Sequence, residues 1–114
     1  GIDYKLPFAE YRKVGGIEWA HSTEQVLREL LANPQHLEVR TTIFPPFHSL
    51  EVLLAMAEEI QKAHSWWWQN FRPEKTLSPE AQTIPPYPQS LLFEWQQRIN
   101  NHLGKELVRL RPAQ

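Results

Sequence analysis

The sequence predicts a small α+β domain, and three patterns along the chain support that prediction. Gly15 and Gly16 stand between two short alternating runs, which is typical of a tight β-hairpin. Residues 37–44 are rich in β-branched side chains and alternate in polarity, as a strand does. Residues 50–71 and 90–110 repeat apolar side chains with the period of a helix. We therefore expect a small antiparallel sheet from the N-terminal half, packed against two long helices and one short helix. A mainly helical protein with a single hairpin is the alternative.

The composition is that of one folded domain covering residues 1–114. Apolar residues make up 41% of the chain and charged residues 22%, which are ordinary values for a globular protein and argue against disorder. The 5 tryptophans let a short chain bury a substantial core. A proline-rich connection, residues 72–89, lies inside the domain. We expect it to be an ordered strap over the surface, with a binding loop as the alternative.

The short helix and the strand have recognisable boundaries. Ser22 followed three residues later by Gln25 is a capping-box pattern, which marks the start of a helix. Pro34 ends this helix, because the residue before a proline avoids the helical conformation. The strand from Leu37 to Phe44 places Leu37, Val39 and Thr41 on one face, and two prolines stop it.

The two long helices are predicted from their apolar stripes. Ser49 is the expected N-cap of the first, and Pro73 closes it after Phe71. Its stripe comprises Leu50, Leu53, Leu54, Ala57, Ile60, His64, Trp67, Trp68 and Phe71. The second has a spine spaced by four, made of Leu91, Trp95, Ile99, Leu103 and Leu107. Gly104 interrupts that helix at a cost of about 1 kcal/mol relative to alanine. Arg109 and Arg111 fall at its C-terminal end, where the helix dipole favours cations.

Charge and cysteine content exclude several classes of protein. The net charge is −1 and no third of the chain is strongly basic, so non-specific nucleic-acid binding is disfavoured. The absence of cysteine excludes disulfides and thiolate sites and fits a reducing compartment, so we expect a cytoplasmic location. The longest aliphatic run, Val52 to Ala57, is far shorter than the roughly 20 residues that span a bilayer, so we expect no membrane association.

No known catalytic or cofactor motif is present. The 4 glycines cannot form a phosphate-binding loop, and no nucleophile elbow exists. The single aspartate, Asp3, argues against two-metal chemistry. Glu58 and Glu59 are adjacent on a helix and therefore point apart, and His102 with Glu106 is better explained as a helix-surface pair than as a metal site. We expect no metal, no cofactor and no catalytic residue.

The three consecutive tryptophans, Trp66, Trp67 and Trp68, are the distinctive feature of the chain. On a continuous helix Trp67 and Trp68 face the apolar stripe, whereas Trp66 falls on the polar side between Glu59 and Lys62. Either the proline-rich strap covers Trp66 within the chain, or a partner or second copy does.

We therefore predict a non-enzymatic protein-interaction or assembly module, with a protein partner or a second copy of the chain. Its contact surface lies at the end of the long central helix, because tryptophan and arginine are the usual hot-spot residues of interfaces. The predicted partner-binding residues are Trp66, Trp67, Phe71, Arg72 and Tyr87.

Two other functions remain open. The alternative is a small-ligand or nucleic-acid binding accessory domain, in which aromatic faces stack on bases and basic side chains meet phosphates. Those basic residues are Arg98, Lys105, Arg109 and Arg111. The third is an enzyme in which a cleft brings His21, His48 or His64 within reach of a glutamate.

Overall fold

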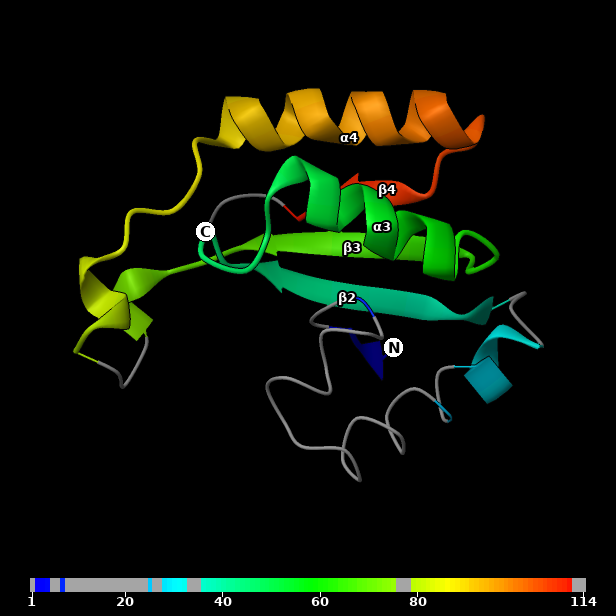
Figure 1. Ribbon diagram of the computed structural model, residues 1–114, viewed down its shortest axis with the longest axis horizontal. Helices are drawn as coiled ribbons and strands as arrows, with labels where there is room; N and C mark the ends of the chain where they lie inside the picture. The colour runs from blue at the N-terminus through cyan, green and yellow to red at the C-terminus, as the bar shows by residue number, and fades with distance from the viewer. Residues whose placement is uncertain are drawn as a thin grey trace.

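Two overlapping strand–helix–strand units form most of the structure (Figure 1). β2 (Glu38–Ile43), α3 (Leu50–Ile60) and β3 (Ser65–Asn70) form the first, and β3 continues through α4 (Gln89–Leu103) to β4 (Val108–Leu110). The described part also contains β1 (Ile2–Asp3) and two short 3-10 helices, η2 (Pro73–Lys75) and η3 (Ala81–Thr83). The structure, a computed structural model, describes residues 2–4, 7, 25, 28–32, 36–75 and 79–111.

The strands of the described sheet are all parallel, in the order β1-β2-β3-β4. The fold is a small α+β arrangement, but the predicted antiparallel sheet is wrong. Adjacent parallel strands require a long crossover between them, and α3 and α4 are those crossovers. The hairpin predicted at residues 11–20 lies outside the described residues, as does most of the short helix, of which residues 25 and 28–31 are helical.

The first long helix is half as long as its stripe predicts. Ser49 is its N-cap as expected, with the hydroxyl accepting the Val52 N–H at 3.2 Å. The helix ends at Ile60, and the tryptophans belong to β3. Lys105 explains where the helix ends, because its ammonium group donates to the carbonyl oxygens of Gln61 at 2.6 Å and Ala63 at 3.2 Å. These carbonyls follow the last turn, where a cation is favourable.

The second long helix is also shorter than predicted, because Gly104 ends it rather than interrupting it. Gly104 has φ of 70°, the left-handed conformation of a helix C-cap, and its N–H donates to the Asn100 carbonyl at 2.9 Å. The chain then turns back into β4. Asn100 holds that strand: its Oδ1 accepts the Val108 N–H at 2.8 Å and its Nδ2 donates to the Val108 carbonyl at 3.1 Å. The amide side chain therefore replaces a neighbouring strand at this edge.

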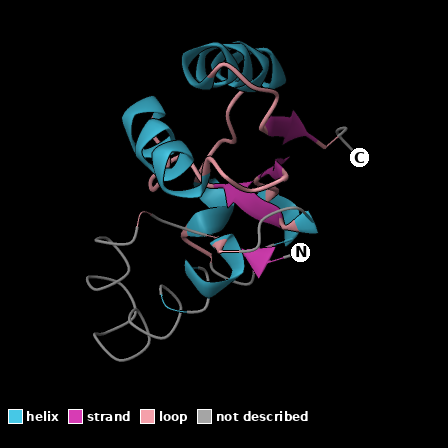
Figure 2. Cartoon of the chain, turned by 90° about the vertical axis from the view of Figure 1, so that its right-hand side faces the viewer, coloured by secondary structure: helices cyan, strands magenta, loops and turns pink. Residues whose placement is uncertain are grey.

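The hydrophobic core lies between one face of the sheet and the two helices, which lie over the same face (Figure 2). The predicted strand at 37–44 is confirmed by β2, whose residues alternate exposed and buried so that Val39, Thr41 and Ile43 point into the core. Trp66 and Trp68 do the same from β3. The helices add a further buried group, made of Leu53, Met56, Ala57, Ile60, Leu92 and Ile99. The assignment of residues 1–114 to a single domain stays a prediction.

Tyr87, within the proline-rich connection, makes contacts with three other parts of the fold. The Tyr87 hydroxyl donates to the His48 carbonyl at 2.7 Å, and its ring meets Trp95 of α4 edge-on at 5.0 Å. Asn70, at the end of β3, donates to the Tyr87 carbonyl at 2.9 Å.

Candidate functional site

The candidate site is the face of the sheet that the helices leave uncovered. Because strand residues alternate between faces, β2 presents Arg40 and Thr42 there, and both are exposed. The strand register places Asp3, Arg40, Trp67 and Arg109 in one row across the four strands. In the described ranges, α3 and α4 both lie over the opposite face of the sheet (Figure 2). The arrangement therefore displays a partly buried tryptophan between charged neighbours.

The charges of this face are unevenly neutralised. The guanidinium carbons of Arg109 and Arg111 lie 5.9 and 5.7 Å from the centre of the Trp67 ring, which is cation–π distance. Neither arginine forms an ion pair with a carboxylate of the described residues. Arg40 lies 3.4 Å from the carboxylate of Asp3, with both side chains largely in solvent. Within the part of the chain that the structure describes, the guanidinium groups of Arg109 and Arg111 are therefore without a carboxylate partner.

A depression of about 200 Å³ lies beside this row. Its lining offers guanidinium, hydroxyl and amide groups from Arg40, Arg111, Thr42 and Gln69, with the Trp67 ring among them. Apart from Asp3, every side chain that lines this depression can donate a hydrogen bond or stack against a flat group of a ligand. Such a lining suits an anionic ligand.

A second pocket, of about 340 Å³, opens where β2 ends. Aromatic rings of Phe44, Phe47 and Phe71 contribute to its wall. It shares Asp3, Arg40, Thr41 and Thr42 with the first depression, so the two are neighbours.

The five predicted contact residues do not form one surface. Trp67 lies on the uncovered face and Phe71 in the aromatic pocket. Arg72 pairs with Glu74 at 3.0 Å, and Tyr87 lies on the helix-covered side against Trp95. Trp66 has 0% of its surface exposed, since the helix that placed it on a polar side ends at Ile60.

Trp66 is part of a buried chain of hydrogen bonds that crosses three segments. Its indole N–H donates to the Thr41 hydroxyl at 2.8 Å, and that hydroxyl donates to the carbonyl oxygen of Tyr4. Its ring also meets Trp68 edge-on at 5.4 Å. These contacts satisfy the polar atom of a large core residue, which is a structural role.

The sequence predicts the position of only one of the three arginines of the site. Arg109 and Arg111 were predicted to lie at a helix end, because the alternation of residues 108–111 was too short to separate from a helical spine. Arg40 alternates with Val39 and Thr41, which is the signal that places it on the opposite face of β2. The position of β4 beside β3 brings these arginines together with Trp67.

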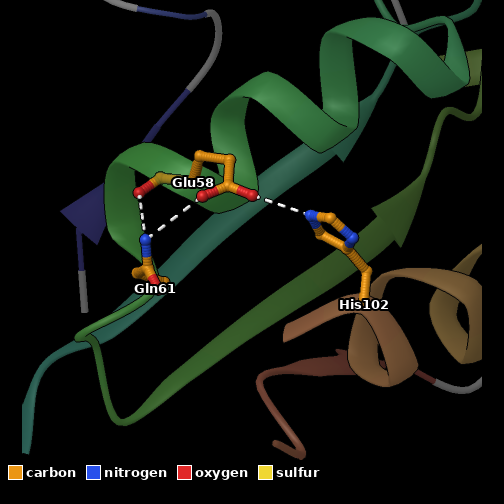
Figure 3. A network of polar contacts seen from close by, with 3 residues as sticks. All are labelled: Glu58, Gln61 and His102. Atoms are coloured by element: carbon orange, nitrogen blue, oxygen red, sulfur yellow. Dashed lines mark hydrogen bonds and ion pairs between the residues drawn. The ribbon is translucent and has the colours of Figure 1, made fainter. Parts of the chain in front are cut away.

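The histidine and glutamate contacts of the described residues do not suggest a metal site. His102 does not pair with Glu106, which lies beyond the end of α4; its Nε2 lies 2.8 Å from Glu58 of α3 (Figure 3). Glu58 also accepts from the Gln61 side chain at 3.3 Å. Both ends of the histidine contact are exposed, so it is a surface link between the helices. Within the described ranges, no group of three or more histidine, cysteine or acidic residues could hold a metal ion.

The described helices include none with the length and apolar character required to cross a bilayer. Comparisons of the chain with protein-family models, with curated proteins and with solved structures found no match.

Proposed function

We propose that this protein binds a small organic anion on the uncovered face of its parallel sheet. The supporting observation is the pair of arginines, Arg109 and Arg111, that flank Trp67 without a carboxylate partner among the described residues. A guanidinium group presents a planar set of donors that matches a carboxylate, sulfonate or phosphate group.

The topology favours a ligand at this position. Parallel sheets are usually covered on both faces, whereas α3 and α4, the long helices of the described residues, both lie over the same face of this one (Figure 2). In open sheets of parallel strands, ligands bind near the carboxyl ends of the strands. Thr42 and Gln69 lie toward those ends of β2 and β3, and Arg111 follows β4, donating its backbone N–H to the Trp68 carbonyl at 3.0 Å.

The test is a titration of isotope-labelled protein with methanesulfonate at constant ionic strength, followed by NMR. We expect the indole N–H signal of Trp67 to shift with a saturable dependence on concentration. Replacing both Arg109→Gln and Arg111→Gln should weaken binding by about tenfold or more, since each charge-assisted hydrogen bond contributes on the order of 1.5 kcal/mol or more.

Arg98→Gln is the matched control, because Arg98 is exposed on α4 and the change in net charge per residue is the same. If Arg98→Gln weakened binding as much as one of the sheet substitutions, the effect would be general charge screening and the proposed site would be wrong. A linear, unsaturable shift in the unaltered protein would also contradict it.

A protein partner is the second candidate for the same face. Tryptophan and arginine, which meet here at Trp67 and Arg109, are the residues most enriched in interface hot spots. Light scattering over a range of protein concentrations would detect self-association, and Trp67→Ala should abolish it under this hypothesis. The proposal also retains the cytoplasmic location, supported by the cysteine-free composition.

A further inference from the structure

The aromatic pocket at the carboxyl end of β2 is well suited to a flat apolar group. Phe44 lines the pocket, and its ring centre lies 5.0 Å from that of Phe47 and 4.8 Å from that of Phe71, both in edge-to-face geometry. Phe47 leaves 44% of its surface exposed and lines the pocket, so its ring is accessible to a ligand there. A volume of about 340 Å³ falls within the range of pockets that hold small ligands.

The turn after β2 holds Phe47 in place before any ligand arrives. The backbone N–H groups of Phe47 and His48 donate to the Phe44 carbonyl at 2.9 and 3.0 Å. In return, the Phe44 N–H donates to Nδ1 of His48 at 2.8 Å, and the His48 side chain is buried. Pro45 and Pro46 restrict the same turn. Binding to a ring that is already positioned costs less conformational entropy.

The aromatic pocket and the anion site meet at Arg40. Arg40 and Thr42 line both the 340 Å³ pocket and the 200 Å³ depression. An apolar group in the pocket therefore lies next to the guanidinium of Arg40, the hydroxyl of Thr42 and the Asp3 carboxylate that pairs with Arg40. Asp3 partly neutralises Arg40, whereas Arg111, which lines the adjoining depression, has no carboxylate partner among the described residues. An acidic group attached to the ring would therefore be attracted by Arg111 as well as by Arg40.

We propose that the ligand of this protein is an aromatic anion, with its ring in the pocket of Phe44, Phe47 and Phe71 and its acidic group in the adjoining depression, which Arg40 and Arg111 line. This inference rests on the proposed function, since it names the class of anion that the uncovered face binds. The predicted role of Phe71 in binding is retained here, with a small molecule in place of a protein.

The experiment compares naphthalene-2-sulfonate, which has both the ring and the charge, with methanesulfonate, which has the charge alone. We expect naphthalene-2-sulfonate to bind at least about tenfold more tightly, the effect of one to two aromatic contacts. The backbone amide signal of Phe47 should shift with the aromatic sulfonate and stay in place with methanesulfonate. Phe47→Ser should remove that tenfold advantage while the affinity for methanesulfonate is unchanged.

Phe93→Ser is the matched control, because Phe93 on α4 is 57% exposed and lines neither pocket. It should change neither affinity. If methanesulfonate binds at the arginines but the ring adds no affinity, or if Phe47→Ser and Phe93→Ser act alike, the aromatic pocket is not part of the site and this inference fails while the proposed function stands. If neither sulfonate binds, the proposed function itself fails.

Discussion

At the scale of single residues, the three consecutive tryptophans have different roles because a strand alternates its side chains. Trp66 and Trp68 point into the core with 0% and 1% of their surface exposed, and Trp67 points to the uncovered face. A helix would have spread the three rings around its circumference, which is why the sequence pattern placed Trp66 on the polar side of the predicted helix. Substitutions of Trp66 therefore test stability, whereas substitutions of Trp67 test the proposed binding site.

Trp66→Ala should lower the free energy of unfolding by about 3–5 kcal/mol, because it leaves a large cavity and removes the donor to Thr41. Trp67→Ala should cost about 1 kcal/mol, the loss of its contacts with two arginines. Urea unfolding followed by circular dichroism measures both without relying on tryptophan fluorescence.

Should Trp66→Ala fail to fold, Trp66→Phe keeps most of the volume and still removes the indole N–H. Equal losses of stability for the Trp66 and Trp67 variants would contradict the assignment of the two rings to opposite faces.

At the scale of elements, the end of α4 is set by a residue at the helix end itself, whereas the end of α3 is bound by a residue distant in sequence. Gly104 ends α4 locally, through its left-handed backbone. Lys105 binds the carbonyls that follow α3 from a position 44 residues away in sequence from Gln61. A local signal can be found in a sequence, whereas a distant one cannot.

Gly104→Ala should destabilise the protein by about 1–2 kcal/mol, the cost of a left-handed conformation for a residue with a Cβ. A Cβ atom at this position would meet no other heavy atom within 4 Å, so the cost is confined to the backbone. Gly104→Asn should cost less, because asparagine adopts this conformation more readily. Urea midpoints of the three proteins give the order. If Gly104→Asn lowered the stability as much as Gly104→Ala, the cost would not come from the backbone conformation.

At the scale of the whole molecule, Tyr87 joins parts of the fold that are far apart in sequence. It bonds the segment before α3 through the His48 carbonyl, the end of β3 through Asn70, and α4 through the Trp95 ring. Burial raises the pKa of the Tyr87 phenol above its usual value of 10.0, since the phenolate is disfavoured away from water.

The pKa shift makes stability fall at alkaline pH. The unfolded chain releases the Tyr87 proton near pH 10.0, whereas the folded protein retains it to higher pH. As the pH rises, deprotonation therefore stabilises the unfolded state before it stabilises the folded state. The stabilisation by Tyr87 is therefore complete below that pH and is lost as the pH rises through the folded-state pKa. Tyr87→Phe should be less stable than the parent at about pH 9, and the difference should shrink at about pH 11. A difference in unfolding free energy that stays constant across this range would contradict the role of the phenol.

The sequence by itself determined the elements whose signals are local. The alternation of β2 and the Ser49 cap of α3 were predicted correctly, because both depend on neighbouring residues. The exposure of Arg40 follows from the same alternation. Trp67 and Phe71 were predicted to bind a partner as aromatic residues at the end of a long helix, but that helix ends at Ile60, and the two residues line the two neighbouring pockets.

Only the tertiary structure decided the direction of the strands, the ends of the long helices and the grouping of the arginines. Residues 61–64 contain neither glycine nor proline, so nothing local marks the change from α3 to β3. The tryptophans become a strand because β2 and β4 pair with them on either side. Arg109 and Arg111 reach Trp67 only through that pairing. Hydrogen bonds between strands form only once segments that are distant in sequence have met. A short apolar run is therefore compatible with either a helix or a strand until the fold places other strands beside it.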